Sequence, residues 1–224
     1  MLGLGVNCME EVISIDWSLV LSLVTAIAAL VALFFSGFQV RQANKQCLFD
    51  RRVKAWLTSL GLFELYEKEE KALVVRSDGP EFANRLQFTW LTNNTFLFEI
   101  GGAVSHPLQE DEQKLFLRKI EELQNLSIEV SLIFKNDSAR SLCKFLDAYK
   151  ELLLVMYRYQ IVLDKMENSS RQFSWTLEKA VQEMPEPDCR SELYDARDKL
   201  RDAFKAYAEK NTAKQLKKQM RLSY

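Results

Sequence analysis

WSLVLSLVTAIAALVALFFSGFQV, residues 17–40, is a run of 24 residues without one charged side chain. As an α-helix it would rise about 36 Å, enough to cross a hydrocarbon core of about 30 Å. The core helices of soluble proteins rarely stay uncharged over such a length. A cleaved signal peptide is also disfavoured, because a basic n-region and a small-residue cleavage site are missing. The run predicts a transmembrane helix, and no second run of this kind follows it.

The charges on either side of this segment are uneven and predict its orientation. Residues 1–16 carry three acidic side chains and no basic one. The segment is followed by a juxtamembrane basic cluster, which consists of Arg41, Lys45, Arg51, Arg52 and Lys54. Because basic residues stay on the cytoplasmic side, we expect residues 1–16 outside and the large C-terminal part in the cytoplasm. The cluster would then lie near anionic lipid headgroups.

The small residues of the apolar segment occur at helical spacing. They form a small-residue stripe, which consists of Ser22, Thr25, Ala29, Ala32 and Ser36. Spacings of three and four residues place them on one side of a helix. In lipid, helices associate through close backbone approach and interhelical hydrogen bonds, which small residues and hydroxyls permit. The stripe predicts a homo-oligomer; the alternative is that Ala, Ser and Thr are simply common in such helices.

The whole chain is poor in the residues that interrupt helices. Its 224 residues include 7 glycines and 4 prolines. That is about 5% of the chain, against an average of about 12%. Together with the apolar segment, this composition predicts an all-α protein. We expect one N-terminal transmembrane helix that continues into a cytoplasmic bundle of about five helices.

Apolar periodicity and turn residues divide the cytoplasmic part. A juxtamembrane stalk helix is expected over 41–75, a helical bundle over 76–209 and a basic tail over 210–224. Within the bundle, 81–103 is expected as a helix followed by a loop. Two long helices are expected next, the first over about 109–135 and the second from Asp137, its N-cap, to about Glu167. A short helix with Phe173, Leu177, Val181 and Met184 follows, and the last helix covers about 188–209.

The basic tail carries five cations and no acidic residue after Glu209. These cations are Lys210, Lys214, Lys217, Lys218 and Arg221. As a purely structural feature, they would complement a helix dipole and keep the tail soluble. The alternative is contact with a membrane or with an anionic partner such as a ribonucleoprotein. Direct nucleic-acid binding is not expected, because apart from Tyr224 no aromatic side chain is interleaved for base stacking.

Motifs for catalysis and cofactor binding are missing from the sequence. The chain has no G-x-x-x-x-G-K, G-x-G-x-x-G, H-E-x-x-H or G-x-S-x-G. Its only histidine, His106, excludes sites that need two and is expected in a loop. Paired carboxylates such as Glu69 and Glu70 are expected on solvated helix faces. We therefore expect a non-enzymatic protein with no catalytic residue, cofactor or metal ion.

The four cysteines share no C-x-x-C spacing. Cys8 would face the oxidising side of the membrane, where it could link two chains. Cys47, Cys143 and Cys189 are expected as reduced thiols in the cytoplasm.

The segment QVRQANKQCLFDRRVKAW, residues 39–56, contains the pattern Q-x-N-K-x-x-L-F-x-x-R. The matching residues are Gln42, Asn44, Lys45, Leu48, Phe49 and Arg52, and TFLFEI at 95–100 adds a downstream Phe-Leu-Phe element. The segment resembles small bacterial membrane proteins with one N-terminal span and a helical cytoplasmic domain. Their layout is similar to that of transmembrane effectors of retron-type phage-defence cassettes. The resemblance implies a bacterial inner-membrane location and brings no catalytic motif.

Three kinds of function follow from these features. The favoured one is a membrane effector of a bacterial antiviral defence system. Its cytoplasmic helices would hold the span quiet until a partner complex releases it to oligomerise and disrupt the bilayer. The alternative is a membrane tether or scaffold that docks a cytoplasmic protein through its helical bundle. An enzyme with an unrecognised helical site is the least expected.

Overall fold

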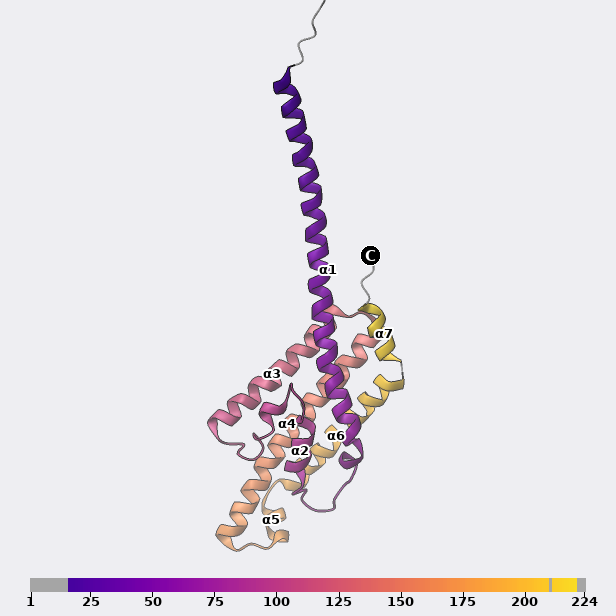
Figure 1. The fold of residues 1–224 in the computed structure, drawn as a ribbon. Helices are drawn as coiled ribbons and strands as arrows, with labels where there is room; N and C mark the ends of the chain where they lie inside the picture. Colours follow the sequence, from indigo (N-terminus) through magenta and orange to yellow (C-terminus); the bar gives the residue numbers. More distant parts are fainter. Residues whose placement is uncertain (1–15, 210, 221–224) are drawn as a thin grey trace, which may run out of the picture. The chain divides into compact units, whose positions relative to one another are not determined.

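The computed structural model describes residues 16–209 and 211–220. In chain order its elements are α1 (Trp17–Leu73), α2 (Asn84–Thr92), the 3-10 helix η1 (Phe98–Ile100), α3 (Glu110–Ile133), α4 (Asn136–Phe173), α5 (Leu177–Glu183), α6 (Glu186–Glu209) and α7 (Thr212–Gln219) (Figure 1). This described part contains no strand. The predicted all-α fold, with one long apolar N-terminal helix followed by a helical bundle, is confirmed.

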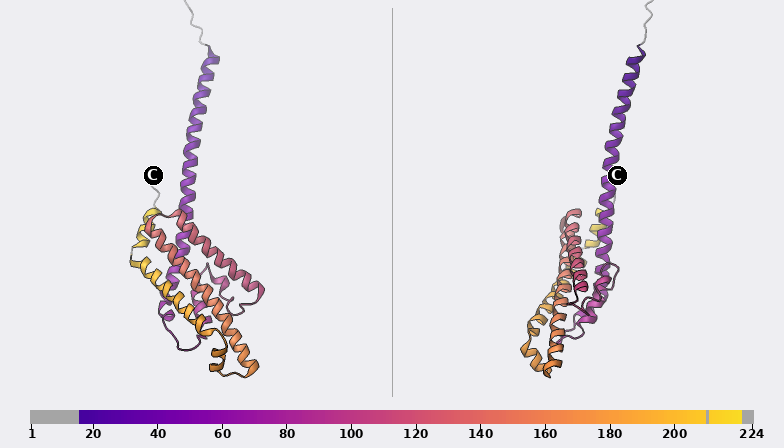
Figure 2. Two further views of the ribbon diagram at one scale, coloured as in Figure 1. Left: turned by 180° about the vertical axis from the view of Figure 1, so that it is seen from behind. Right: turned by 90° about the vertical axis from the view of Figure 1, so that its left-hand side faces the viewer.

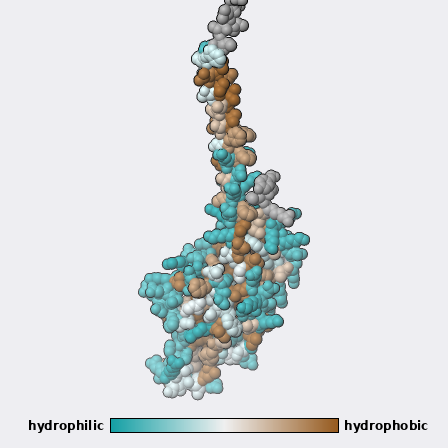
Figure 3. All heavy atoms as spheres, viewed as in Figure 1, coloured by the Kyte–Doolittle hydropathy of each residue, from teal (hydrophilic) through white to brown (hydrophobic). Residues whose placement is uncertain are grey.

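The chain divides into two compact units, residues 1–47 and residues 48–224, and α1 contributes to both. In the first unit every residue from Asp16 to Cys47 is exposed. The N-terminal part of α1 is mainly hydrophobic in Figure 3, whereas the surface of the second unit is mainly hydrophilic. Among the residues that the structure describes, α1 is the one helix long and apolar enough to cross a membrane.

Asp16 defines the start of α1. Its carboxylate accepts hydrogen bonds from the backbone N–H of Ser18 at 3.0 Å and from the Ser18 hydroxyl at 2.7 Å. These bonds hold the pKa of Asp16 below its ordinary value of 3.8. A carboxylate here satisfies backbone N–H groups that have no partner inside the helix. The apolar helix therefore begins immediately after a charged residue.

The second unit is built around α4. This helix contacts α2, α3, α5, α6 and α7. The chain turns from α3 into α4 through Phe134 and Lys135, and after α5 it returns along α4 as α6 (Figures 1 and 2). The reason is visible in the periodicity of α4, whose buried side chains include Leu142, Phe145, Tyr149, Leu152, Met156, Tyr159 and Leu163. An apolar stripe of this length must be covered by several neighbouring helices.

An aromatic cluster joins the last part of α1 to α4 and α6. The ring of Phe63 lies 4.4 Å from that of Phe204 in a stacked arrangement and 5.5 Å from that of Phe145. Tyr66, one turn further along α1, lies 5.0 Å from Phe204. Each such aromatic pair contributes about 0.5–1.5 kcal/mol beyond the area that it buries. One side of residues 48–73 of α1 thus belongs to the bundle core.

Residues 81–103 contain the short helix α2 and then a tight loop. After α2 ends, the side-chain oxygen of Asn94 accepts the N–H groups of Phe96 at 3.0 Å and Leu97 at 2.8 Å. Such local bonds compete with a continuing helix and favour a turn. The buried Leu97 and Ile100 then anchor the loop on the core.

The start of α4 differs from the prediction. The helix begins at Asn136, so Asp137 lies in its first turn, where it pairs with Arg140 at 3.1 Å. The turn is instead held by the side chain of Gln219, which accepts the N–H of Lys135 at 2.8 Å and donates to its carbonyl at 3.0 Å. The prediction of Asp137 as N-cap is wrong because a residue 84 positions away satisfies this backbone.

Three other element ends also differ from the sequence-based expectation. Phe173, expected in the short helix, ends α4 instead, and Ser174 then adopts a left-handed φ of 54°. The last long helix, α6, begins at Glu186 and includes Pro187 in its first turn, where the missing N–H of proline is tolerated. Residues 210–224, expected as a basic tail, contain the helix α7.

Replacing Leu152 by alanine tests the central position of α4. This side chain is 0% exposed, and its truncation should lower the free energy of unfolding by about 2–5 kcal/mol. The matched control is Leu132→Ala, which removes the same atoms from a side chain that is 79% exposed. It should change stability by less than about 0.5 kcal/mol. Guanidinium unfolding of the full chain in detergent, followed by near-UV circular dichroism, measures both; equal losses would contradict the described packing.

Candidate functional site

The small-residue stripe lies within the described part of α1, and its five residues are all exposed. The Ser22 hydroxyl donates to the carbonyl of Ser18, and the Thr25 hydroxyl donates to the carbonyl of Leu21, each at 2.8 Å. Both protons are therefore satisfied within the helix, as a polar group in lipid requires. What the stripe offers to a neighbouring helix is close approach at its alanines and spare oxygen lone pairs.

The juxtamembrane basic cluster is not one uniform cationic surface. Arg41, Lys45, Arg51 and Lys54 are exposed. Arg52 is half-buried and belongs to the bundle of the second unit. The sequence grouped these five residues by charge alone, whereas the structure gives Arg52 a different environment from the other four.

Arg52 joins the ends of two helices. Its Nε donates to the carbonyl of Ile133 at 2.8 Å, and its Nη1 donates to the carbonyl of Gln219 at 2.7 Å. These carbonyls lie at the C-terminal ends of α3 and α7, where unpaired carbonyl groups give the helix dipole a negative end. The guanidinium also lies 6.0 Å from the centre of the Phe134 ring. We call this set of contacts the Arg52 junction.

Three of the predicted C-terminal cations line one open groove. Lys214, Lys217 and Lys218 lie on α7, and the groove has a volume of about 650 Å³. Phe63 of α1 and Tyr207 of α6 also line it, with their ring centres 4.6 Å apart. The other two predicted cations, Lys210 and Arg221, lie outside the described residues. In the sequence no aromatic residue lies between these lysines, but in the structure two aromatic side chains line the same groove.

A buried polar cluster, which was not predicted, joins the loop after α1 to α2 and α6. The Arg197 guanidinium pairs with both oxygens of Glu81, at 2.9 and 2.5 Å, and it also hydrogen-bonds to Gln87. Arg197 is 5% exposed and Glu81 is 7% exposed. Removing one partner of such a buried pair costs about 3–5 kcal/mol, because the other charge is left unpaired. The pair therefore fixes the loop against the bundle.

Tyr159 extends this cluster to a second carboxylate. Its hydroxyl donates to Glu186 at 2.5 Å and accepts the N–H of Glu81 at 2.9 Å. Burial raises the pKa of Tyr159, and the bond to Glu186 raises it further, so the phenol stays protonated. The cavity beside Arg197 measures about 10 Å³, which holds about one water molecule. These contacts join the loop after α1 to α4 and α6.

One signal in the sequence does point to this cluster. Arg197 lies four residues after Leu193 and three before Leu200, so the periodicity of α6 places it on the core side. A charge in that position needs a buried partner. The identity of the partner cannot be read locally, because Glu81 lies 116 residues away in the chain.

The histidine and the cysteines have ordinary environments. His106 is exposed, in the turn before α3. Cys47 is also exposed, whereas burial raises the pKa of Cys143 and Cys189, which lowers their reactivity. Cys8, expected to link two chains, lies outside the described residues. Within residues 16–209 and 211–220, no group of three His, Cys, Asp or Glu side chains is arranged to hold a metal ion.

Comparisons of this chain with protein-family models, with curated proteins and with solved structures find no match. The function of this chain is therefore inferred from the chemistry of the sites described above.

The neighbouring arginines 51 and 52 provide a matched test of the Arg52 junction. Arg52→Ala removes the donors to two helix ends and should lower the free energy of unfolding by about 1–3 kcal/mol. Arg51→Ala removes the same charge from an exposed position and should change it by less than about 0.5 kcal/mol. Hydrogen exchange of α7, measured by mass spectrometry on the full chain in detergent, should accelerate only in Arg52→Ala. Unchanged exchange in α7 would show that the junction does not hold this helix.

Proposed function

We propose that this chain is a membrane-anchored, non-enzymatic effector that acts on the bilayer in which its apolar helix lies. The observation that carries the proposal is that residues 17–40 of α1 are uncharged and exposed along their whole length. Apolar surface of this extent needs a cover of lipid or of other apolar helices. A passive anchor shares that requirement. The small-residue stripe favours the effector, because it allows copies of the helix to associate.

The proposed location is the bacterial inner membrane, crossed once, with the N-terminus outside and the bundle in the cytoplasm. The exposed cations Arg41, Arg51 and Lys54, which follow the apolar segment, support this orientation. The bacterial inner membrane rests on the resemblance of residues 39–56 to small bacterial single-span membrane proteins. The role in antiviral defence rests on the similarity of their layout to that of retron-type effectors.

In the proposed mechanism, the cytoplasmic helices hold the apolar helix in a quiet state until a partner complex, a cytoplasmic protein or ribonucleoprotein, releases it. This release lets the small-residue stripes meet and the helices oligomerise. Residues 17–40 contain no charged or strongly polar side chain apart from Gln39 at the end. The resulting damage would therefore be a lesion or lipid disorder rather than a selective channel.

A membrane tether or scaffold is the second candidate, and one surface favours it. Leu117, Ile128 and Leu132 lie toward the outer side of α3 and are 51%, 48% and 79% exposed. Ile128 and Leu132, one turn apart, are exposed apolar neighbours that offer a contact to another protein, and Leu117 lies three turns earlier on the same helix. In this function the apolar helix only localises the bundle at the membrane.

The orientation is tested by two reporters fused after Tyr224 of the full chain. Green fluorescent protein should fluoresce, because it folds in the cytoplasm, and alkaline phosphatase should be inactive, because it needs the oxidising side. Fusion of the same reporters to a variant with Arg41, Lys45, Arg51 and Lys54 changed to Gln should weaken this difference. Active phosphatase on the unchanged chain would reverse the proposed orientation.

The effector is tested by induced expression in growing bacteria with a membrane-potential dye. The unchanged chain should depolarise the cells, whereas Ala29→Leu with Ala32→Leu should reduce depolarisation at least about tenfold by blocking close approach on the stripe. The control, Val24→Leu with Val31→Leu, also adds two leucines but lies away from the stripe and should leave depolarisation unchanged. Equal depolarisation by the two double variants would contradict the proposed role of the stripe. Harmless expression of the unchanged chain, alone and with the products of neighbouring genes, would favour the tether.

A further inference from the structure

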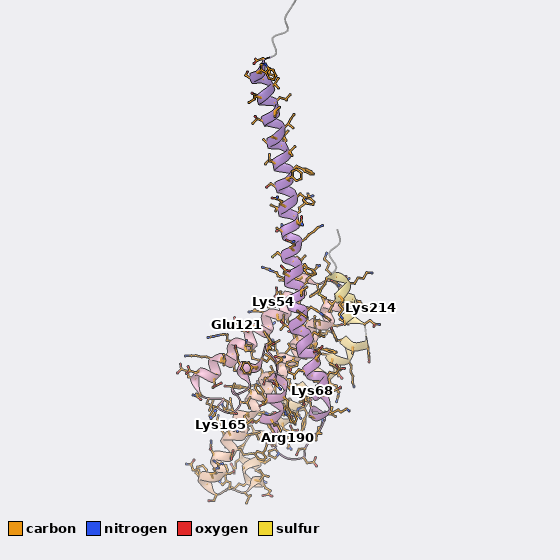
Figure 4. The ribbon with its side chains drawn as sticks, viewed as in Figure 1. Lys54, Lys68, Glu121, Lys165, Arg190 and Lys214 are labelled. Carbon is orange, nitrogen blue, oxygen red and sulfur yellow. The ribbon has the colours of Figure 1, made fainter. Side chains whose placement is uncertain are left out.

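Three lysines lie within five residues of one another on α7. Lys214, Lys217 and Lys218 line the groove, and Figure 4 marks Lys214 on this helix. In the part of the chain that the structure describes, none of the three forms an ion pair. Like charges three and four residues apart on a helix repel each other. A bound anion would remove this repulsion.

The start of α7 adds two further features that favour an anion. Asn211 precedes the helix with a left-handed φ of 49°, and its side chain makes no capping hydrogen bond. Thr212, the first residue of α7, is 1% exposed, and its hydroxyl has no hydrogen-bond partner among the described residues. Both residues line the groove. A helix N-terminus beside an unused hydroxyl suits a phosphate oxygen, which accepts hydrogen bonds from both.

The remaining wall of the groove is apolar. The half-buried Phe63 provides an aromatic ring, which is backed by the ring of Tyr207, only 4% exposed, and Ala208 and Ala213 provide methyl groups. A ligand that carries a flat ring beside its phosphates would bury this ring against the aromatic wall, as bases do on aromatic side chains. The volume of about 650 Å³ lies within the range of about 300–1,000 Å³ found for small-molecule sites. A protein partner, in contrast, would need a contact of about 800 Å² on each side.

We propose that this groove binds a nucleoside polyphosphate. Its phosphates would lie at the three lysines and at the start of α7, and its base would lie on Phe63. The site is formed entirely by residues of the second unit, so it does not depend on the proposed membrane activity. It gives the bundle a ligand whose concentration the cell can vary.

The test uses the full chain in a neutral detergent and the fluorescent nucleotide mant-ATP as the probe. Binding should be saturable, with about one nucleotide per chain. Unlabelled ATP should displace the probe, tripolyphosphate should displace it more weakly, and adenosine should displace it only at the highest concentrations. Lys214→Gln with Lys217→Gln should weaken binding about tenfold, because two charge-assisted contacts are lost. Ala208→Trp, which fills the groove without changing its charge, should abolish binding.

The matched control is Lys68→Gln with Lys165→Gln. It removes the same two charges from exposed positions that do not line the groove, and Figure 4 marks both residues. This variant should bind mant-ATP as the unchanged chain does. Absence of saturable binding, or an equal loss in the control, would overturn the site. Binding of phosphatidylglycerol vesicles through the same lysines, with no nucleotide binding, would also overturn it and identify a lipid surface instead.

Discussion

The stacking of Phe63 on Phe204, with Phe145 beside both rings, is the contact on which the second unit depends. It is the point where α1, α4 and α6 meet, so it closes the core around the central helix. Without it, the last part of α1 would present an uncovered apolar face to water. Because the same helix also contains residues 17–40, one continuous element carries an exposed apolar segment long enough to cross a membrane and then a side of the aromatic core of the second unit.

The polar interactions serve this packing by completing what helices leave unsatisfied. A helix ends with carbonyl groups that have no partner inside it. In this bundle Arg52 donates hydrogen bonds to terminal carbonyls of α3 and α7. The side chain of Gln219 accepts the backbone N–H of Lys135 in the turn before α4. Arg197 and Glu81 neutralise each other inside the core and bind the loop that leaves α1. The charges of this chain are therefore divided between a solvated surface and a few buried positions that join distant segments.

The sequence allowed the features that depend on local periodicity to be predicted. The apolar segment 17–40, the buried side of α4 and the buried positions Leu193, Leu200 and Tyr207 of α6 all follow from the spacing of their own residues. The features that were missed depend on residues far apart in the chain. Gln219 acts in place of Asp137 from 84 positions away, and Glu81 meets Arg197 from 116 positions away. The groove was missed for the same reason, since its lysines and its Phe63 become neighbours only in the fold.

The Arg52 junction also has a consequence for synthesis on the ribosome. Arg52 and Gln219 are 167 residues apart. At about 5–20 residues per second, about 8–33 s pass between the synthesis of the two. During this interval the apolar helix has already been made, while the helix end that Arg52 will join does not yet exist. Closure of the bundle is thus a late event that only a complete chain can reach. Premature termination would leave the apolar helix joined to a second unit that has not closed.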